Sequence, residues 1–288
     1  MDLNFASSKD TIFYKKTSIN CKGNLLNLDE PKVMGILNLT PDSFFDGGTL
    51  KTEADIILRV ENMLKAGADI IDIGGMSSRP GAKIISIAEE IKRVTPVISL
   101  LTRQFKNIII SVDTFRHEVA EKALHNGASI INDISGGKLD KKMLDFVAIN
   151  KVPYILMHMQ GTPETMQQNP HYKNVVLEVA QFFSTQLDYL YKHGANDIIL
   201  DPGFGFGKTL AHNYSLLKHL SYFKQLFGLP LLAGVSRKSM INKVLNTSPK
   251  EALNGTTVLN TIALLNGADI LRVHDVKEAK ECVGFFVN

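Results

Sequence analysis

The segment Gly67-Ala68-Asp69-Ile70-Ile71-Asp72 has three further versions in this chain, and this repeat indicates the fold. In each version a helix-like segment ends in Gly-Ala, and a short run rich in isoleucine then stops at a polar residue. Glycine just past a helix supplies a left-handed cap, and the apolar run is typical of a strand buried on both faces. A parallel strand that ends in a polar residue delivers it to the carboxyl edge of the sheet, where α/β proteins bind small molecules. The other versions are 127–132, 194–201 and 267–272.

Over the whole chain, eight short apolar segments follow one another, and a helical pattern comes after each of them. Eight strand–helix units within about 250 residues are expected of a (β/α)8 TIM barrel. A doubly wound sheet is the alternative, but it usually has fewer strands, and no Gly-rich fingerprint follows the first strand here. We therefore predict an α/β protein built as a (β/α)8 barrel. The predicted strands are Val33–Asn38, Asp69–Gly74, Ile108–Asp113, Ser129–Asp133, Tyr154–His158, Asp197–Asp201, Leu231–Val235 and Ile270–Val273, and the predicted helices include Glu53–Lys65, Ile87–Gln104, Arg116–Asn126, Asn174–His193 and Ser215–Phe227.

The first 31 residues lack a helical pattern. A short hairpin turning at Lys22-Gly23-Asn24 is predicted there, so we expect residues 1–31 to form an extension that caps the amino end of the barrel, and residues 32–288 to form the barrel itself. Three longer irregular stretches follow strands, which is typical of an active-site rim. They are Thr40–Leu50, Met76–Ile85 and Gln160–Tyr172.

Composition narrows the class of protein. Hydrophobic residues make up 44% of the 288 residues and charged residues 21%, which is typical of a globular protein with ample core. A net charge of +3 argues against nucleic acid as a partner and suits a small anionic ligand. Two cysteines do not make a disulfide framework, and no apolar run approaches the ~20 residues that span a bilayer. We expect a cytoplasmic protein without a membrane partner.

Polar side chains stand at the carboxyl end of every predicted strand. A single Asp or Asn there is usually a helix cap, and Asp113-Thr114 fits that reading. Capping does not explain all eight, because Arg, Lys and His do not cap helix amino termini. The set in chain order is Asn38, Ser77-Ser78-Arg79, Asp113, Asn132-Asp133, His158, Asp201, Ser236-Arg237-Lys238, and Arg272 with His274.

These side chains match a ligand with two parts. Carboxylates and amides deep in an apolar barrel suit a flat heterocycle with adjacent N–H donors, since one carboxylate accepts two parallel N–H bonds. The cations Arg79, Arg272 and His274, together with Asn38, would gather around an anion such as phosphate. The sequence therefore predicts a site for a ring and an adjoining anion.

Other motifs leave alternatives open. The segment Asp201–Lys208 (DPGFGFGK) misses the nucleotide P-loop pattern and fits either a tight loop whose backbone approaches a ligand, with Phe206 as an apolar wall, or a purely structural turn. His158 on an apolar strand is more often an interior histidine than a ligand. Asp42 and Asp46, with Asn38 behind them, form a weak Mg2+ site if a phosphate shares the ion, or they simply shape turns.

Eight motifs follow one another in order over nearly the whole chain: MGILNLTPDSFFDGG, DIGGMSSRPGA, SVDTFR, INDISGG, LMHMQGTP, DPGFGFGK, GVSRKSMI and RVHDV. Together they resemble one family, dihydropteroate synthase. The resemblance implies the condensation of 6-hydroxymethyl-7,8-dihydropterin diphosphate with p-aminobenzoate, which gives 7,8-dihydropteroate and diphosphate in folate biosynthesis. It also implies a cytoplasmic homodimer, Mg2+ as the cofactor, and sulfonamides as inhibitors. Pterin-dependent methyltransferases share the barrel but are not expected to show TPDSF, SRPGA and SRKS together.

The resemblance further implies a role for each matching residue. The pterin ring would lie against Asp113, Asn132, Ile134, Met159, Asp201, Phe206 and Lys238. The diphosphate would be held by Asn38, Arg79, Arg272 and His274, and Mg2+ by Asn38, Asp42 and Asp46. The p-aminobenzoate pocket would be formed by Phe44, Ser78, Arg79, Pro80, Phe206, Lys238 and Ser239. Residues implied in catalysis itself are Asp113, Asp201, Lys238, Arg79, Asp42 and Asp46.

The chain departs from the family's usual GGESTRPG, because Met76 and Ser78 replace Glu and Thr. Serine keeps the hydroxyl group, whereas methionine removes a charge beside a loop. Phe45 stands where a small residue is common. We expect these changes to alter p-aminobenzoate affinity and the binding of sulfonamide-type mimics.

Overall fold

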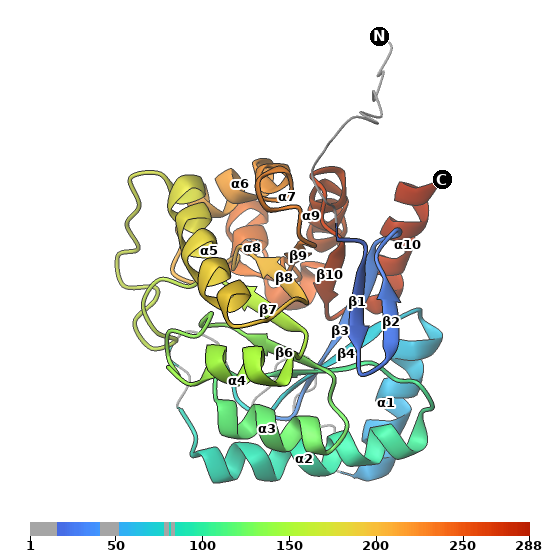
Figure 1. Cartoon of the computed structure of the whole chain (residues 1–288). Coiled ribbons are helices and arrows are strands. Elements are labelled where there is room, and N and C mark those ends of the chain that lie inside the picture. The colour runs from blue at the N-terminus through green and yellow to red at the C-terminus, as the bar shows by residue number, and fades with distance from the viewer. Residues whose placement is uncertain (1–15, 41–51, 78–80, 82–83) are drawn as a thin grey trace.

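The barrel is closed. A computed structural model describes residues 16–40, 52–77, 81 and 84–288. Its centre is an eight-stranded sheet in the order β8-β7-β6-β5-β4-β3-β10-β9, and a parallel bridge between Leu200 and Leu231 joins the two edge strands. Every neighbouring pair in this sheet is parallel, and helices surround it (Figure 1). The predicted (β/α)8 TIM barrel is confirmed.

The elements follow one another as strand and helix. The barrel strands are β3 (Lys32–Asn38), β4 (Ile70–Gly74), β5 (Ile110–Asp113), β6 (Ile130–Asp133), β7 (Tyr154–Met157), β8 (Ile198–Asp201), β9 (Leu232–Ala233) and β10 (Ile270–Val273). The helices are α1 (Glu53–Lys65), α2 (Ile87–Gln104), α3 (His117–His125), α4 (Met143–Asn150), α5 (Val175–Lys192), α6 (Leu210–Lys218), α7 (Leu220–Phe227), α8 (Ser239–Leu245), α9 (Leu253–Leu265) and α10 (Val276–Val287), with a 3-10 turn at Pro249–Glu251.

Two predicted elements were wrong in extent. The single helix predicted over Ser215–Phe227 is two helices, α6 and α7, because the backbone leaves the helical region at His219 (φ −106°, ψ 21°). The first of them begins earlier than predicted, where the side chain of Thr209 accepts a hydrogen bond from the amide of His212. The seventh barrel strand, predicted over Leu231–Val235, is reduced to the two residues of β9. The helices α1 and α2 have the predicted bounds.

The repeat does what its sequence predicts. All four of its glycines have positive φ, between 91° and 117°, just after a helix. The alanine that follows each of them is buried, so the small side chain lets the helix return closely to the barrel. The helix ends and the strand starts are thus fixed four times by the same local signal.

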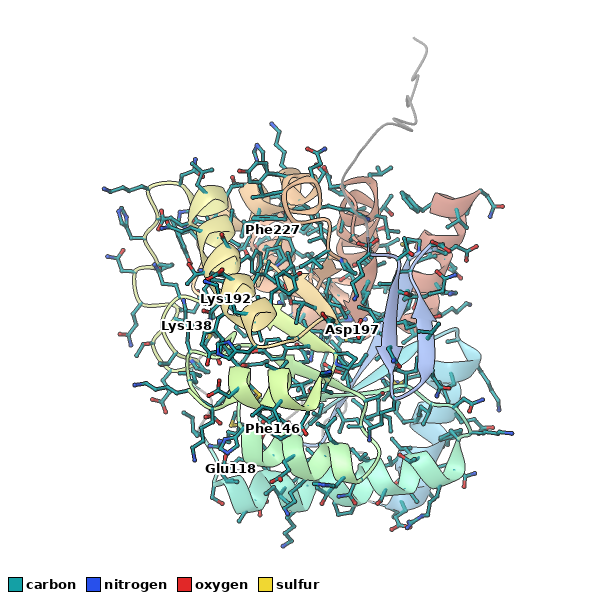
Figure 2. All side chains as sticks on the ribbon, in the orientation of Figure 1. Glu118, Lys138, Phe146, Lys192, Asp197 and Phe227 are labelled. Carbon is teal, nitrogen blue, oxygen red and sulfur yellow. The ribbon has the colours of Figure 1, made fainter. Side chains whose placement is uncertain are left out.

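The predicted hairpin is present at the amino end. Strand β1 (Ser18–Cys21) pairs antiparallel with β2 (Asn24–Asn27), and Ile19, Cys21 and Leu26 pack in one cluster with the lowest inward-facing side chains of the barrel. The ammonium of Lys16 lies 2.8 Å from the carboxylate of Asp197, which is labelled in Figure 2. The hairpin therefore covers the end of the barrel opposite to the carboxyl edge.

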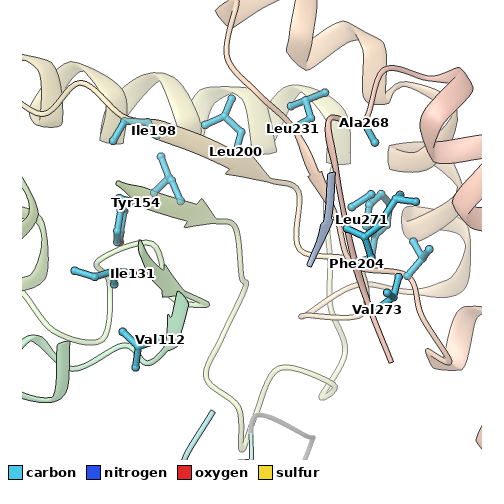
Figure 3. Packing of buried hydrophobic residues seen from close by; sticks show 14 of the residues in the cluster. Val112, Ile131, Tyr154, Ile198, Leu200, Phe204, Leu231, Ala268, Leu271 and Val273 are labelled. Carbon is cyan, nitrogen blue, oxygen red and sulfur yellow. The ribbon is translucent and has the colours of Figure 1, made fainter. Parts of the chain in front are cut away.

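A larger apolar layer lies between the strands and the helices. Side chains such as Val112, Ile131 and Tyr154 point outward from successive strands into this layer (Figure 3). Charged side chains such as Lys192 lie on the outer surface of the helices (Figure 2). Among the described residues, none of the helices combines the length and the apolar character that crossing a bilayer requires.

Candidate active site

The four copies of the repeat enter the barrel in the same phase. Side chains two positions apart in a strand face the same side of the sheet. Their inward-facing isoleucines, at positions 70, 130, 199 and 270, fill the bottom layer of the barrel. The residue two positions further on is polar in every copy and lies one layer higher. These residues are Asp72, Asn132, Asp201 and Arg272, and Asp113 of β5 lies in register with Asn132.

Arg272 joins two of the carboxylates in this layer. Its Nε donates to Oδ2 of Asp72 at 2.6 Å, and its Nη2 donates to Oδ2 of Asp113 at 2.7 Å. The amide of Asn132 donates to the same oxygen of Asp72 at 3.1 Å. Four strands, β4, β5, β6 and β10, thus contribute to one hydrogen-bonded cluster, which we call the acid–arginine cluster (Asp72, Asp113, Asn132 and Arg272).

Burial sets the electrostatics of this cluster. It raises the pKa of Asp113 to about 7, although the neighbouring guanidinium of Arg272 acts in the opposite direction. Burial also disfavours the charge on Arg272, but the carboxylates of Asp72 and Asp113 outweigh it and raise the pKa of the guanidinium. The site can therefore hold its arginine charged and titrates at a carboxyl group instead.

A second pair of opposite charges lies beside the cluster. Burial raises the pKa of Asp201, against the effect of the Lys238 ammonium, and burial lowers the pKa of Lys238 to about 8, against the effect of Asp201. The ammonium of Lys238 donates to the carbonyl oxygen of Phe204 and lies 4.7 Å from the centre of the Phe206 ring. This lysine thus contacts an aromatic face and extends from the loop after β9. We call the acid–arginine cluster together with Asp201 and Lys238 the polar well.

Three of the residues predicted to lie against the pterin form an apolar wall. Ile134, Met159 and Phe206 belong to one cluster with Phe115, Met157 and Met166. The departure at Met76 lies against the same cluster, so the methionine extends this wall where the family usually has a charged residue. The wall and the acid–arginine cluster together offer a flat ring both an apolar face and a polar edge.

The loop between Asp201 and Lys208 is held by its own lysine. The buried ammonium of Lys208 lies 3.1 Å from Nδ1 of His158 and donates to the carbonyl oxygens of His158, Gly203 and Phe206 at 2.9–3.1 Å. Burial and the charge on Lys208 lower the pKa of His158 to about 2, so the imidazole is neutral and accepts. The interpretation of His158 as an interior histidine is confirmed, and its partner Lys208 was missed.

Close packing of two backbone segments requires glycine at position 203. Gly203 has a φ of +71°, and a Cβ there would lie 2.0 Å from the carbonyl oxygen of His158. Its amide donates to Oδ1 of Asp201 at 2.7 Å. The close approach of the two backbone segments therefore requires glycine at this position. The amide of the same glycine orients the carboxylate of Asp201.

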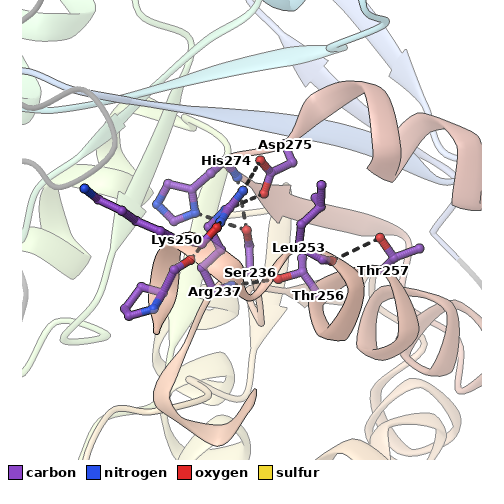
Figure 4. Close-up of polar contacts among 9 residues, drawn as sticks. Ser236, Arg237, Lys250, Leu253, Thr256, Thr257, His274 and Asp275 are labelled. Carbon is purple, nitrogen blue, oxygen red and sulfur yellow. Dashed lines mark hydrogen bonds and ion pairs between the residues drawn. The ribbon is translucent and has the colours of Figure 1, made fainter. Parts of the chain in front are cut away.

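Some polar residues at the strand ends serve the fold. The guanidinium of Arg237 donates twice to Asp275, at 2.7 Å each, and also to the carbonyl oxygens of Pro249 and Lys250 (Figure 4). Asp133 faces outward from β6, where its carboxylate accepts from Ser135, Gly137 and Tyr154. Neither side chain belongs to the well.

The predicted anion group is only partly brought together. Asn38 and Asp113 lie in register on either side of Gly74, and a Cβ at Gly74 would lie 3.6 Å from Oδ1 of Asn38 and 3.6 Å from Cβ of Asp113. The missing side chain leaves room between them. Nδ1 of His274 lies 3.0 Å from the hydroxyl of Ser236 (Figure 4), whereas Arg272 is bonded to the two carboxylates.

Ser239, which is predicted for the p-aminobenzoate pocket, begins α8 and is exposed. The residues that lie outside the described ranges are Asp42, Phe44, Asp46, Ser78, Arg79 and Pro80, together with the departure at Phe45. Conversely, sequence reasoning missed Asp72 as a site residue, although it ends the first copy of the repeat as Asn132, Asp201 and Arg272 end the others.

The barrel, the polar well and the apolar wall together define the class of protein to which this chain belongs. Residues 34–274 match the family described as "Pterin binding enzyme". The chain is 48% identical to the dihydropteroate synthase of Escherichia coli (strain K12) over 264 residues, which cover 91% of this chain and 93% of that one. The chain belongs to the dihydropteroate synthase family, whose members are transferases.

Solved structures agree with this assignment. A dihydropteroate synthase from Yersinia pestis in complex with a sulfonamide drug has a TM-score of 0.89 and 44% identity, covering 94% of this chain and 98% of that chain. The enzyme from Xanthomonas albilineans in complex with 7,8-dihydropteroate has a TM-score of 0.82 and 38% identity, covering 94% and 97%.

Proposed function

We infer that this chain condenses 6-hydroxymethyl-7,8-dihydropterin diphosphate with p-aminobenzoate, giving 7,8-dihydropteroate and diphosphate. Its membership of the dihydropteroate synthase family over nearly its whole length supports this activity. The structural observation that carries the inference is the layer of acids and amide at the carboxyl end of the barrel. Such a layer can pair with the N–H groups along one edge of a pterin ring.

The polar edge of the ring is assigned to four side chains. Asp113 and Asp201 would accept its N–H groups, Asn132 would donate and accept, and Lys238 would donate to the carbonyl side of the ring. Ile134, Met159 and Phe206 would cover the ring faces, since they already form the apolar wall. Each of the four polar side chains except Lys238 comes from a strand, so the polar edge is read by a rigid scaffold.

The diphosphate is assigned to the outer rim of the well. Asn38, Arg79, Arg272 and His274 would gather around it, because cations and an amide donor suit phosphate oxygens. Asn38, Asp42 and Asp46 would supply an all-oxygen donor set, which is the kind that Mg2+ prefers. When bound there, the ion would neutralise charge on the leaving diphosphate. Of these three donors, Asn38 alone is among the described residues.

The chemistry assigned to the residues is electrostatic. The bond between the pterin methylene carbon and the diphosphate oxygen breaks, and the electron pair leaves with the diphosphate. The carboxylates of Asp113 and Asp201 lie near the cationic pterin that remains and favour it. The amine of p-aminobenzoate then attacks the methylene carbon and loses a proton to solvent, so the step needs no strong base. Phe44, Ser78, Arg79, Pro80, Phe206, Lys238 and Ser239 are the proposed p-aminobenzoate pocket.

The test is release of diphosphate when both substrates are mixed with Mg2+. We expect wild-type protein to release it and Asp201→Asn to abolish release while the circular-dichroism spectrum stays unchanged. A matched control is Asp197→Asn, since Asp197 directly precedes the same strand, at the end opposite to Asp201, and pairs with Lys16. It should retain turnover. Turnover by Asp201→Asn near the wild-type level would remove Asp201 from its role, and no diphosphate from wild type would refute the activity.

The assembly is also a proposal. We propose a homodimer formed through α9, whose outward stripe contains Val258 and Leu265, exposed by 50% and 66%. Burying such side chains against a second copy would remove apolar surface from water. Light scattering should give twice the chain mass for wild type and the monomer mass for Val258→Glu with Leu265→Glu. Within each copy, residues 1–31 are proposed as the extension and residues 32–288 as the barrel.

A further inference from the structure

Asp72 lies at the centre of the acid–arginine cluster, and only one of its two carboxylate oxygens accepts hydrogen bonds among the described residues. The residue is fully buried, and its side chain points into the barrel. Its Oδ2 accepts from Arg272 and from Asn132, whereas its Oδ1 has no hydrogen-bond partner within the described part of the chain. A buried carboxylate oxygen left unpaired is costly, so Asp72 is not explained by its present bonds alone.

Arg272 and the pterin ring need the same carboxylate. Nη2 of Arg272 lies 2.7 Å from Oδ2 of Asp113, to which the proposed function assigns N–H groups of the ring. A ring edge with two parallel N–H groups needs both oxygens of a carboxylate, and Nη2 of Arg272 already occupies one of the two oxygens of Asp113. A ring bound in this way displaces the guanidinium from Asp113. When the ring carries no diphosphate to pair with Arg272, the buried guanidinium needs another negative partner.

We propose that Asp72 is a positioning residue of the reaction: it retains Arg272 at the barrel wall when the ring takes over Asp113. The inference rests on the proposed function and deepens it. Asp72 is suited to this because both Nε and Nη2 of Arg272 already lie 2.6 Å from its Oδ2. The bond from Asn132 fixes the orientation of the carboxylate, and the fully buried site keeps water from replacing it as the partner.

The proposal explains why three acids and two bases share one well. In this structure Arg272 pairs with both Asp72 and Asp113, so it balances two carboxylates at once. When the ring binds, its N–H donors satisfy Asp113, and Asp72 keeps the guanidinium paired. Without the charge of Asp72, ring binding would leave the buried guanidinium of Arg272 without an anionic partner. The affinity for the ring would therefore fall.

The variant that tests this is Asp72→Asn, which keeps the shape of the side chain and removes its charge. The probe is 6-hydroxymethylpterin, titrated calorimetrically into the protein. We expect its affinity to fall by about tenfold to a hundredfold, the effect of losing one hydrogen bond to a charged group. The KM for p-aminobenzoate at saturating pterin diphosphate should stay within about twofold. A change of less than about twofold in probe affinity would overturn the proposal.

A matched control separates positioning from mere stability. Asp133→Asn removes an equally buried carboxylate from β6, but one that faces away from the well. It should lower the free energy of unfolding and leave probe affinity within about twofold. In an Arg272→Gln background, Asp72→Asn should lose its effect on the probe, because the two residues act through one contact. An undiminished effect there would contradict the proposal.

A measurement without any variant covers the case in which Asp72→Asn does not fold. The crystal structure of the wild-type chain with 6-hydroxymethylpterin should show Arg272 bonded to Asp72 and no longer to Asp113. An arginine that stays on Asp113 beside a bound ring would refute the inference. Failure of the proposed function is a separate result, since it would appear as a wild-type protein that releases no diphosphate from the two substrates.

Discussion

Replacing Gly203 by alanine tests whether contact with the neighbouring backbone fixes the loop that carries Phe206. A Cβ at this position would lie 2.0 Å from the carbonyl oxygen of His158 and 3.1 Å from its carbonyl carbon, at a φ of +71°. Gly194 is the matched control, because it also has a positive φ, of +92°, but nothing lies within 4 Å of the Cβ it would gain. The two variants share the backbone strain and differ in the contact.

The size of each effect follows from these distances. A left-handed backbone costs a non-glycine residue about 1–2 kcal/mol, and the stiffer unfolded chain returns about 0.4–1 kcal/mol. Gly194→Ala should therefore lose about 1 kcal/mol of unfolding free energy. Gly203→Ala adds an overlap that needs a shift of about 1 Å to relieve, which costs about 1–3 kcal/mol more. Because the Gly203 amide holds Asp201, that shift should also lower kcat/KM, by up to about a hundredfold.

Urea denaturation of both variants, followed by circular dichroism, measures the difference in unfolding free energy. Steady-state release of diphosphate measures the effect on kcat/KM. We expect Gly203→Ala to be the less stable of the two by about 1–3 kcal/mol and to be alone in losing activity. Equal losses of stability in the two variants would refute the argument that the approach to His158 demands glycine at position 203.

Three further predictions concern other parts of the site. Lys208→Met leaves backbone carbonyls without their charged donor, so it should lower the free energy of unfolding by about 2–4 kcal/mol, as measured by urea denaturation. It should also raise the pKa of His158 in an NMR titration, and an unchanged His158 pKa would contradict the prediction. The affinity for 6-hydroxymethylpterin should fall about tenfold per pH unit as the pH drops below about 7, because burial raises the pKa of Asp113 to about 7 and its carboxylate is then protonated. Calorimetry at several pH values measures this dependence, and an Asp113→Asn variant with the same dependence would exclude Asp113 as its cause. Met76→Glu brings a charge to the apolar wall and should change p-aminobenzoate affinity, which identical constants for the variant and the native chain would disprove.

Local patterns in the sequence are enough to predict the barrel and the place of its chemistry. The Gly-Ala-(Ile) repeat fixes helix ends, strand starts and the phase of each strand through local properties, namely glycine at positive φ and the alternation of side chains in a strand. For that reason Asn132, Asp201 and Arg272 were predicted at one edge and lie there. The same repeat contains Asp72, so that residue was within reach of the sequence.

Which of these groups bind each other depends on the folded barrel and could not be predicted from local patterns. Arg272 and Asp72 are 200 residues apart in the chain, and Arg272 and Asp113 are 159 apart, so their pairing depends on how the closed sheet brings β10 next to β3 and on to β4 and β5. The bond between Lys208 and His158 likewise depends on two loops that meet only when β7 and β8 pair. Local sequence sets the direction in which a side chain points, whereas the choice among several buried partners follows from burial and register across the barrel, which no local pattern encodes.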